Sequence, residues 1–498
     1  MRGFSTHLRV SIALSLFLLG GFSPATQENG LNADVPGGTI SGKQVDGTTV
    51  FLGVPYAAPP VGDLRWKAPQ PVVPWEGVRD ATQTAPACMQ NDEGWNHGAW
   101  LRASEDCLTL NIHTPSRDGK LPVMVFIHGG GEVAGSADIM TDSTFPQHGV
   151  VGVDVQYRLG ALGFMSHPAL SAEQGGHSGN YGIMDLIAAL EWVQANISSF
   201  GGDPDNVTIF GESAGSMNVS LLLAVPDAQG LFDKAIMQSA NFWSLGPDYR
   251  SLAAAEKIGT QFGELAGAQT AEDLRRISPV AIMTLQQQLT DPEWASLIWT
   301  VVTLDGQTIP SSPAGLIVKN SPKPVILGTN KAEFGPADDA GIADYADLFF
   351  GDNAAAALAA YREEQADPRR GDLRLRLGSD QVFHCATDKL ADLLAGHGWP
   401  VWRYEYDIGE DGGLTAHALE LGDVFHRREI GNGAHMQDYW AALAVTGDPN
   451  GATLVSSDRP GWDGWDPAAP RQLALSMAAT EMEPGKPRAR FCAFAAGD

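Results

Sequence analysis

Positive charge is scarce in this chain. Its 498 residues include 32 lysines and arginines against 59 aspartates and glutamates, and the formal net charge is −27 at pH 7. No basic stripe or basic tail interrupts this acidity, and an acidic surface repels the phosphates of nucleic acids and anionic membranes. We therefore expect no nucleic acid partner, and we interpret the acidity as a feature that keeps the protein soluble.

Long hydrophobic runs are also lacking after the first residues. The apolar stretch Val10 to Phe22 has about 13 residues, whereas a membrane-spanning helix needs about 20. Arg2 and Arg9 precede this stretch and Ser23-Pro24-Ala25 follows it, which is the order found in a cleaved secretory signal. We predict that residues 1–25 are a signal peptide, that the protein is secreted or periplasmic, and that its mature form has no membrane segment. The alternative, an N-terminal anchor, is disfavoured by the short apolar run.

Cysteine is rare as well. The chain has four cysteines, Cys88, Cys107, Cys385 and Cys492. An even number in an exported chain favours two disulfides over free thiols, and three pairings are possible. Metal ligation is the alternative, but the chain has no C-x-x-C motif and no Cys/His cluster. We expect neither a metal nor a cofactor.

The most informative pattern is Gly211-Glu212-Ser213-Ala214-Gly215. It fits G-x-S-x-G and lies between a predicted buried strand, Val207 to Phe210, and a predicted helix, Ser216 to Val225. A serine at such a turn is held in a strained conformation with its hydroxyl exposed, and the glycines leave the room that the turn needs. The amide of Ala214 would point from the helix N-terminus toward a developing oxyanion. The pattern predicts that Ser213 is a nucleophile.

A serine nucleophile needs a base, and the base needs an acid. In enzymes with this turn the order along the chain is serine, acid, histidine. Glu333 follows a predicted strand, Pro324 to Leu327, and His417 lies in a loop after another, Val401 to Tyr406. We predict Glu333 as the acid and His417 as the base. Two alternative acids lie near Glu333 in the sequence, Asp338 and Asp339.

A run of glycines, His128-Gly129-Gly130-Gly131, directly follows the predicted strand Pro122 to Ile127. Consecutive glycines let backbone amides turn inward, as an oxyanion hole requires. A phosphate cradle is the alternative, but no Gly-Lys-Ser/Thr follows. The run is therefore interpreted as part of an oxyanion hole.

Short apolar strands alternate with helices along the chain, which predicts an α/β fold with a mostly parallel sheet and helices on both faces. Further strands are expected at Val150 to Gln156 and Lys234 to Gln238, and a helix at Tyr181 to Ile197. We predict one catalytic domain over residues 26–498, with helical cap insertions near 242–299 and 344–395.

With these motifs in place, the chain resembles the type-B carboxylesterase (carboxylesterase–cholinesterase) family of α/β-hydrolases. Phe200 to Gly215 resembles the family's serine active-site signature, and Glu105 to Ile112 resembles its second signature. The similarity extends from Gly53–Ala57 to Thr446–Gly451. The resemblance implies the α/β-hydrolase fold, with a central sheet, helices on both faces and helical cap insertions.

The resemblance also implies roles for individual residues. The implied triad is Ser213, Glu333 and His417, and the implied oxyanion donors are the amides of Gly130, Gly131 and Ala214. It further implies a disulfide between Cys88 and Cys107 at the mouth of the active site, and with it a second one between Cys385 and Cys492.

Three residues depart from the family pattern and are possible substrate contacts. Glu132 follows the glycine run where members usually carry an aromatic residue, which puts a carboxyl group close to the oxyanion hole. Arg427 and Arg428 follow His417 where a more apolar continuation is expected, and a guanidinium there could bind a substrate carboxylate. The alternative is that both arginines pair with acids of the protein itself.

We interpret the chain as a secreted serine hydrolase that cleaves carboxylic esters of small organic molecules through an acyl-enzyme intermediate. An amide or carbamate hydrolase on the same triad is the alternative. A non-catalytic binding protein on this fold is a further alternative, but such proteins lose a triad residue and none is lost here. The expected partner is a small-molecule ester, and the sequence does not indicate an oligomeric state.

Overall fold

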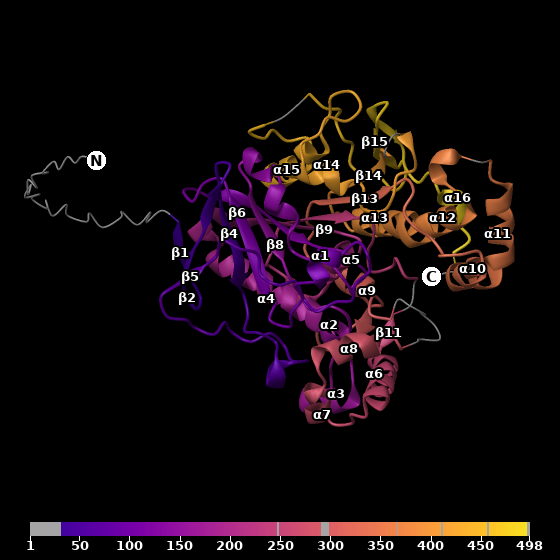
Figure 1. The fold of residues 1–498 in the computed structure, drawn as a ribbon. Coiled ribbons are helices and arrows are strands. Elements are labelled where there is room, and N and C mark those ends of the chain that lie inside the picture. Colours follow the sequence, from indigo (N-terminus) through magenta and orange to yellow (C-terminus); the bar gives the residue numbers. More distant parts are fainter. Residues whose placement is uncertain are drawn as a thin grey trace, which may run out of the picture.

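A large mixed sheet forms the centre of the computed structural model, which describes residues 31–246, 249–289, 298–365, 367–409, 412–455 and 458–495 (Figure 1). The predicted signal peptide lies outside these residues. Among the described residues the sheet has eleven strands, in the order β16 (Thr480–Pro484), β15 (Arg471–Ser476), β14 (Val401–Asp407), β13 (Val325–Asn330), β10 (Lys234–Gln238), β9 (Gly202–Glu212), β7 (Leu121–Ile127), β8 (Val151–Val155), β6 (Thr109–Thr114), β4 (Thr48–Pro55) and β3 (Lys43–Val45).

The middle of the sheet is parallel and its edges are antiparallel. From β8 to β15 each strand runs parallel to its neighbours. The outer pairs β8–β6, β6–β4, β4–β3 and β15–β16 are antiparallel. Parallel strands need crossover connections and are buried on both faces. The prediction of an α/β fold with a mostly parallel sheet is confirmed.

Alternating side chains of the strands pack on two sets of helices. On one face, Val123 and Val125 of β7 join a core with α4 (Tyr181–Asn196), α5 (Ala214–Ala224) and α13 (Ala386–Gly396). On the other face, Met124 and Phe126 join a core with α14 (Leu421–Phe425) and α15 (Met436–Thr446). Successive side chains of a strand point to opposite faces, so both sets of helices are anchored by the same short strands.

The strand before Ser213 is longer than predicted. The expected Val207–Phe210 is the buried centre of β9, which already begins at Gly202. The polar stretch after Gly202 has the composition of a turn, yet Leu121 pairs with Gly202 and the register shifts before Val123 pairs with Val207. Such a bulge accommodates extra residues while the strands stay paired.

Two groups of helices lie away from the central sheet, one below it and one to its right in the view of Figure 1. The first follows β10 and contains α6 (Leu252–Ala266), α7 (Ala271–Arg276) and α8 (Pro279–Gln286). The second lies between β13 and β14 and begins with α10 (Gly341–Phe350), α11 (Ala354–Glu363) and α12 (Leu373–Gly378). Both regions are helical, as the sequence indicated, whereas their role as caps of a single domain stays a prediction.

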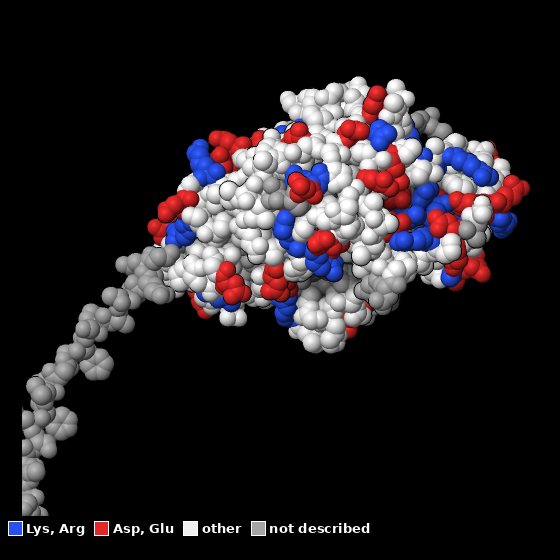
Figure 2. Space-filling view, turned by 90° about the horizontal axis from the view of Figure 1, so that it is seen from above, with Lys and Arg blue, Asp and Glu red and all other residues white. Residues whose placement is uncertain are grey.

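The surface carries both signs of charge. On the face shown in Figure 2, acidic and basic side chains are interspersed among neutral ones, and a mixed group gathers at the end that carries α11 and α12. In the part of the chain that the structure describes, no helix has both the length and the apolar character needed to cross a membrane.

Two disulfides join distant segments. Cys88 pairs with Cys107, and Cys385 pairs with Cys492, with Cα–Cα distances of 5.1 and 5.3 Å. The second bond connects the π-helix η8 (Ser379–Cys385) to the short helix α16 (Ala489–Cys492) near the C-terminus. Both pairings agree with those that the family resemblance implied.

The two disulfides should differ in their contribution to stability. They close loops with sequence separations of 19 and 107 residues. Loop-closure entropy then predicts a loss of about 3 kcal/mol when Cys88 and Cys107 are both replaced by alanine, and about 5 kcal/mol for the Cys385/Cys492 pair. Urea unfolding of the oxidised proteins measures both losses. A reversed order, or free thiols in a non-reducing peptide map, would contradict this pairing or its entropic effect.

Candidate active site

Ser213 occupies a strained turn between β9 and α5. Its φ and ψ are 55° and −126°, a conformation that residues with a side chain rarely adopt. The Ser213 amide donates a hydrogen bond to Gln238 O at the end of β10, at 2.9 Å. A Cβ atom on Gly211 would lie 2.6 Å from the backbone of Gly215, and one on Gly215 would lie 2.0 Å from Ile127 O. The turn therefore requires glycine at both positions, as the motif predicted.

The structure brings His417 and Glu333 together. His417 Nδ1 lies 2.7 Å from Glu333 Oε2, and the imidazole side chain is 20% exposed. Glu333 Oε1 accepts hydrogen bonds from Ser239 Oγ and from the Asn330 amide, each at 2.7 Å. The Glu333 amide donates to Ser379 Oγ at 2.9 Å. Two hydrogen bonds thus hold the carboxylate and a third holds the Glu333 backbone.

The alternative acids do not take this position. Asp338 accepts a hydrogen bond from the Gly341 amide at 3.1 Å, and the Asp339 side chain is 91% exposed and faces Arg374. Neither carboxylate contacts His417 in the described part of the chain. The geometry favours Glu333 over both.

Two further buried glutamates surround His417, and the sequence analysis missed both. Glu212 Oε1 lies 3.1 Å from His417 Nε2. Glu420 accepts hydrogen bonds from Asn330 Nδ2 at 2.7 Å and from Gln238 Nε2 at 3.1 Å. Glu212 lies inside the G-x-S-x-G motif, and Glu420 follows His417 by three residues. Their closeness in the sequence to Ser213 and His417 was the signal that could have identified them as site residues.

These carboxyl groups change the basicity of the imidazole. Burial by itself lowers the pKa of His417, but the charges of Glu212 and Glu333 outweigh burial and raise it to about 9. Burial raises the pKa of Glu212 to about 8, against the attraction of His417, and raises that of Glu420 to about 7. Glu212 and His417 therefore interact through charge, although neither Glu212 Oε1 nor His417 Nε2 forms a well-directed hydrogen bond with a described residue.

Two aromatic rings hold the other sides of the imidazole. The Phe334 and Phe383 rings lie 4.9 and 5.0 Å from the His417 ring, measured between centroids. Phe334 is also 40% exposed, and it borders an open pocket of about 550 Å³ beside Glu333 and Leu414. The imidazole is therefore packed against aromatic rings and remains partly exposed.

The glycine run lies directly beside Ser213. A Cβ atom on Gly129 would be 2.9 Å from Ser213 Cβ, and one on Gly130 would be 2.1 Å from Ala134 O. Gly130 and Gly131 have φ values of 109° and 63°. Only glycine adopts such angles without strain and lets the backbone approach so closely.

Glu132 is buried next to this run. It is 3% exposed, and burial raises the pKa of its carboxyl group to about 8, while hydrogen bonding with Tyr157 and Asn218 opposes the rise. The carboxyl group lies close to the glycine run, as expected. Its predicted contact with substrate stays a prediction, because the side chain is enclosed by protein.

Both arginines after His417 are engaged by carboxylates of the protein. Arg427 Nε lies 2.8 Å from Asp438 Oδ1, and Arg428 Nε lies 2.6 Å from Asp423 Oδ1. These contacts agree with the alternative interpretation of the sequence, in which both arginines pair with acids of the protein itself. Substrate binding by either one stays a prediction without support from these contacts.

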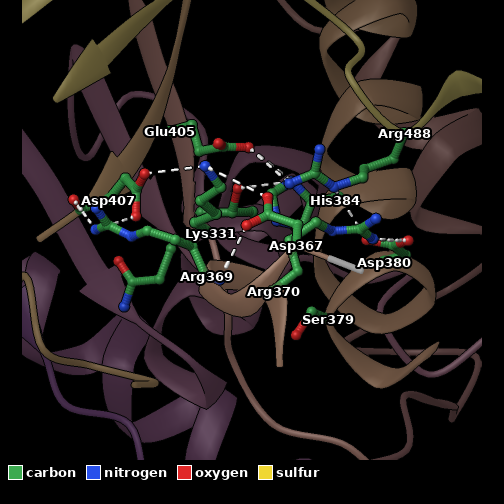
Figure 3. A network of polar contacts seen from close by, with 12 residues as sticks. Lys331, Asp367, Arg369, Arg370, Ser379, Asp380, His384, Glu405, Asp407 and Arg488 are labelled. Carbon is green, nitrogen blue, oxygen red and sulfur yellow. Dashed lines mark hydrogen bonds and ion pairs between the residues drawn. The ribbon is translucent and has the colours of Figure 1, made fainter. Parts of the chain in front are cut away.

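A network of ion pairs surrounds η8, the helix that carries Ser379 (Figure 3). Asp380, next to Ser379 on η8, lies 2.5 Å from Arg370 Nη2 and 3.2 Å from Arg488 Nε. The network continues through the side chains of Lys331, Asp367, Arg369, His384, Glu405 and Asp407. It anchors the helix that presents the Ser379 hydroxyl to Glu333. No group of His, Cys, Asp or Glu side chains within the described ranges is arranged to hold a metal ion.

Comparisons with known proteins agree with this geometry. The sequence profile of the Carboxylesterase family matches residues 29–348. The fumonisin B1 esterase of Sphingopyxis macrogoltabida is 36% identical over 84% of this chain and 82% of its own. The para-nitrobenzyl esterase of Bacillus subtilis is 34% identical over 83% and 89%. The phenmedipham hydrolase of Pseudarthrobacter oxydans is 33% identical over 84% and 90%.

The comparison with solved structures also finds esterases. A PNB esterase superposes with a TM-score of 0.80 at 29% identity, covering 94% of this chain and 99% of its own. The carboxylesterase EST55 of Geobacillus stearothermophilus superposes with a TM-score of 0.75 at 31% identity, covering 94% and 100%. Because the family profile matches more than half of the sequence and these likenesses span most of its length, the chain belongs to the carboxylesterase family and is a carboxylic ester hydrolase with the α/β-hydrolase fold.

Proposed function

We propose that Ser213, His417 and Glu333 are the catalytic triad with which this carboxylesterase cleaves esters of small organic molecules. The assignment depends on how three residues from separate parts of the chain are held. Ser213 occupies a strained turn, and His417 Nδ1 forms a hydrogen bond of 2.7 Å with Glu333. Such an arrangement provides a nucleophile, a base and an acid that fixes the tautomer of the base.

The reaction then runs in two halves. Ser213 Oγ attacks the ester carbonyl carbon while its proton passes to His417 Nε2, and Glu333 stabilises the imidazolium. The amides of Gly130, Gly131 and Ala214 bind the oxyanion that forms. The C–O bond of the ester breaks, and the alcohol leaves with the proton from His417. Water then attacks the acyl-enzyme by the same route and releases the acid.

Glu212 has a defined place in this scheme. Its Oε1 faces Nε2 of His417, the nitrogen that must accept the proton of Ser213. A carboxylate at this position stabilises the imidazolium and makes the imidazole a stronger base. For the reaction to begin, the contact of Nε2 with Glu212 must give way to one with Ser213 Oγ.

The substrates are proposed to be neutral esters. The protein is acidic overall, with a formal net charge of −27 at pH 7, which disfavours the approach of anionic substrates. The similarity to a fumonisin B1 esterase and a para-nitrobenzyl esterase supports ester cleavage. Carbamates are a second candidate class, because the similarity to a phenmedipham hydrolase favours them and the same serine chemistry acts on them.

We also infer that the protein works outside the cytoplasm. Two disulfides are typical of secreted and periplasmic proteins, because cytosolic thiols are kept reduced. The N-terminal sequence that precedes the described residues has the order of a secretory signal.

The nucleophile can be tested by covalent labelling. A fluorophosphonate probe should label the protein once, on Ser213, and Ser213→Ala should remove the label. Turnover of a para-nitrophenyl ester should fall by roughly 10⁴-fold or more, with residual activity from the oxyanion hole and substrate binding. Ser216→Ala, which changes another serine one turn into α5, is the control and should keep the label. Hydrolysis near the normal rate by Ser213→Ala would refute the assignment.

The acid can be tested against its neighbours in the sequence. Glu333→Gln keeps the shape of the side chain but removes the charge that stabilises the imidazolium, so kcat should fall by roughly 10³-fold or more. Asp338→Asn and Asp339→Asn are the matched controls and should be nearly silent. A severe loss in either control with little loss in Glu333→Gln would show that the acid lies elsewhere.

The role of Glu212 predicts a pH dependence. His417 must be neutral to act as a base, and its raised pKa of about 9 means that kcat/KM should still be rising with pH above the usual histidine range. Glu212→Gln removes one of the three charges that raise this pKa, so the rising limb should move to lower pH. The exposed Glu191→Gln is the control. An unchanged limb in Glu212→Gln would contradict the proposed effect on His417.

A further inference from the structure

Two exposed apolar side chains lie on the loops that carry Glu333 and His417. Phe334 directly follows Glu333 and is 40% exposed. Leu414 precedes His417 by three residues and is 42% exposed. Single exposed apolar residues are normal on a protein surface. These two border the same hollow of about 550 Å³, so the two loops together present an apolar wall to it.

The Phe334 ring connects this hollow to the imidazole of His417. The centroids of the two rings lie 4.9 Å apart and their planes are at 84°, an edge-to-face contact. Phe383 packs on the same imidazole at 5.0 Å, but it is 1% exposed. Of these two aromatic neighbours, Phe334 is therefore the one that a bound molecule can touch.

Apolar groups and a paired arginine complete the lining of the hollow. Pro336 and Leu375 extend the apolar wall. Arg374 also lines the hollow, but its guanidinium is engaged by Asp372 at 3.0 Å and by Asp339 at 3.6 Å. An anionic group would have to compete with these carboxylates, whereas a neutral apolar group gains from burial. Pockets of this size and character hold small organic molecules.

The direction of proton transfer indicates which part of the ester lies there. When the ester C–O bond breaks, the leaving oxygen must lie within hydrogen-bond reach of His417 Nε2, which protonates it. The alcohol part is attached to that oxygen, whereas the acyl carbon is bonded to Ser213 Oγ. The alcohol part therefore extends past the imidazole, toward the exposed ring that packs against it.

We propose that Phe334 and Leu414 bind the alcohol part of the ester, and that Phe334 gives the enzyme a preference for esters of aromatic alcohols. An aromatic ring in the hollow packs on Phe334 edge-to-face or offset, which stabilises it beyond the burial of apolar area. The leaving group makes this contact, so the contact affects formation of the acyl-enzyme and not its hydrolysis. The proposal rests on the proposed function, since it requires His417 to protonate the leaving alcohol.

The preference is tested with two esters that share the acetyl group, benzyl acetate and methyl acetate. The ratio kcat/KM covers the steps up to release of the alcohol, so it reports contacts with the alcohol part. Phe334→Ala should lower kcat/KM for benzyl acetate roughly tenfold, the loss expected for an aromatic contact together with buried apolar area. Methyl acetate has no ring to lose this contact, so its kcat/KM should fall by less than roughly twofold.

Leu414→Ala tests the second side of the hollow. It should lower kcat/KM for benzyl acetate roughly threefold and leave methyl acetate unchanged, because it removes apolar area but no ring. Leu265→Ala is the matched control, because Leu265 is 48% exposed and lies on α6, outside the lining of the hollow. It should leave the benzyl-to-methyl ratio unchanged. If Phe334→Ala fails to fold, Phe334→Leu keeps apolar bulk beside His417 and should still lower this ratio.

A second pair of esters separates the alcohol part from the acyl part. Methyl phenylacetate and methyl acetate share the alcohol and differ in the acid. Phe334→Ala should change kcat/KM for both by the same small factor. A selective loss on methyl phenylacetate, with benzyl acetate unaffected, would mean that the acyl part occupies the hollow and would overturn the proposal.

Other results would also overturn it. Equal losses on benzyl acetate and methyl acetate would mean that Phe334 only supports the His417 ring. An unchanged benzyl-to-methyl ratio in the variants of both Phe334 and Leu414 would mean that the hollow does not bind the substrate. An active Ser213→Ala would instead refute the proposed function, whereas an inactive Ser213→Ala together with an unchanged ratio in Phe334→Ala would refute this proposal alone.

Discussion

The hydrogen bond between His417 Nδ1 and Glu333 joins loops that lie 84 residues apart, and much of the polar structure supports it. Glu333 is placed by the end of β13 and is held by Ser239, which follows β10, and by Ser379 on η8. His417 depends on the loop after β14. The bond therefore requires the parallel order of β10, β13 and β14, and any change in that order would separate His417 from Glu333.

This arrangement buries several carboxyl groups around one imidazole, which costs free energy. Glu212 and Glu420 have raised pKa values, and burial is the largest cause for each. Asn330 and Gln238 supply hydrogen bonds to Glu420. Carboxylates close to a histidine stabilise its protonated form, and they raise the pKa of His417 to about 9 against the effect of burial.

The glycine run beside Ser213 depends on close backbone contact rather than on charge. Gly129 lies against Ser213, and Gly130 lies against Ala134, at distances that no side chain would allow. Such a loop has few side chains to hold it, so its carbonyls and the residues behind it determine where its amides point. Tyr157 and His128 lie in that second layer.

The sequence by itself determined the parts of the protein that are encoded locally. The turn at Ser213 is recognisable because the glycines, the strand and the helix are adjacent in the chain, and the order of Glu333 and His417 follows from the order of the strands. The outer antiparallel strands, Ser239, Ser379 and the approach of Glu212 to His417 were decided by the tertiary structure, since residues distant in sequence meet only after the sheet forms. Arg427 and Arg428 show the same limit, because their closeness to His417 in the sequence does not determine where their side chains point. The carboxylates of Asp438 and Asp423 bind them, and only the folded chain brings Asp438 within reach of Arg427.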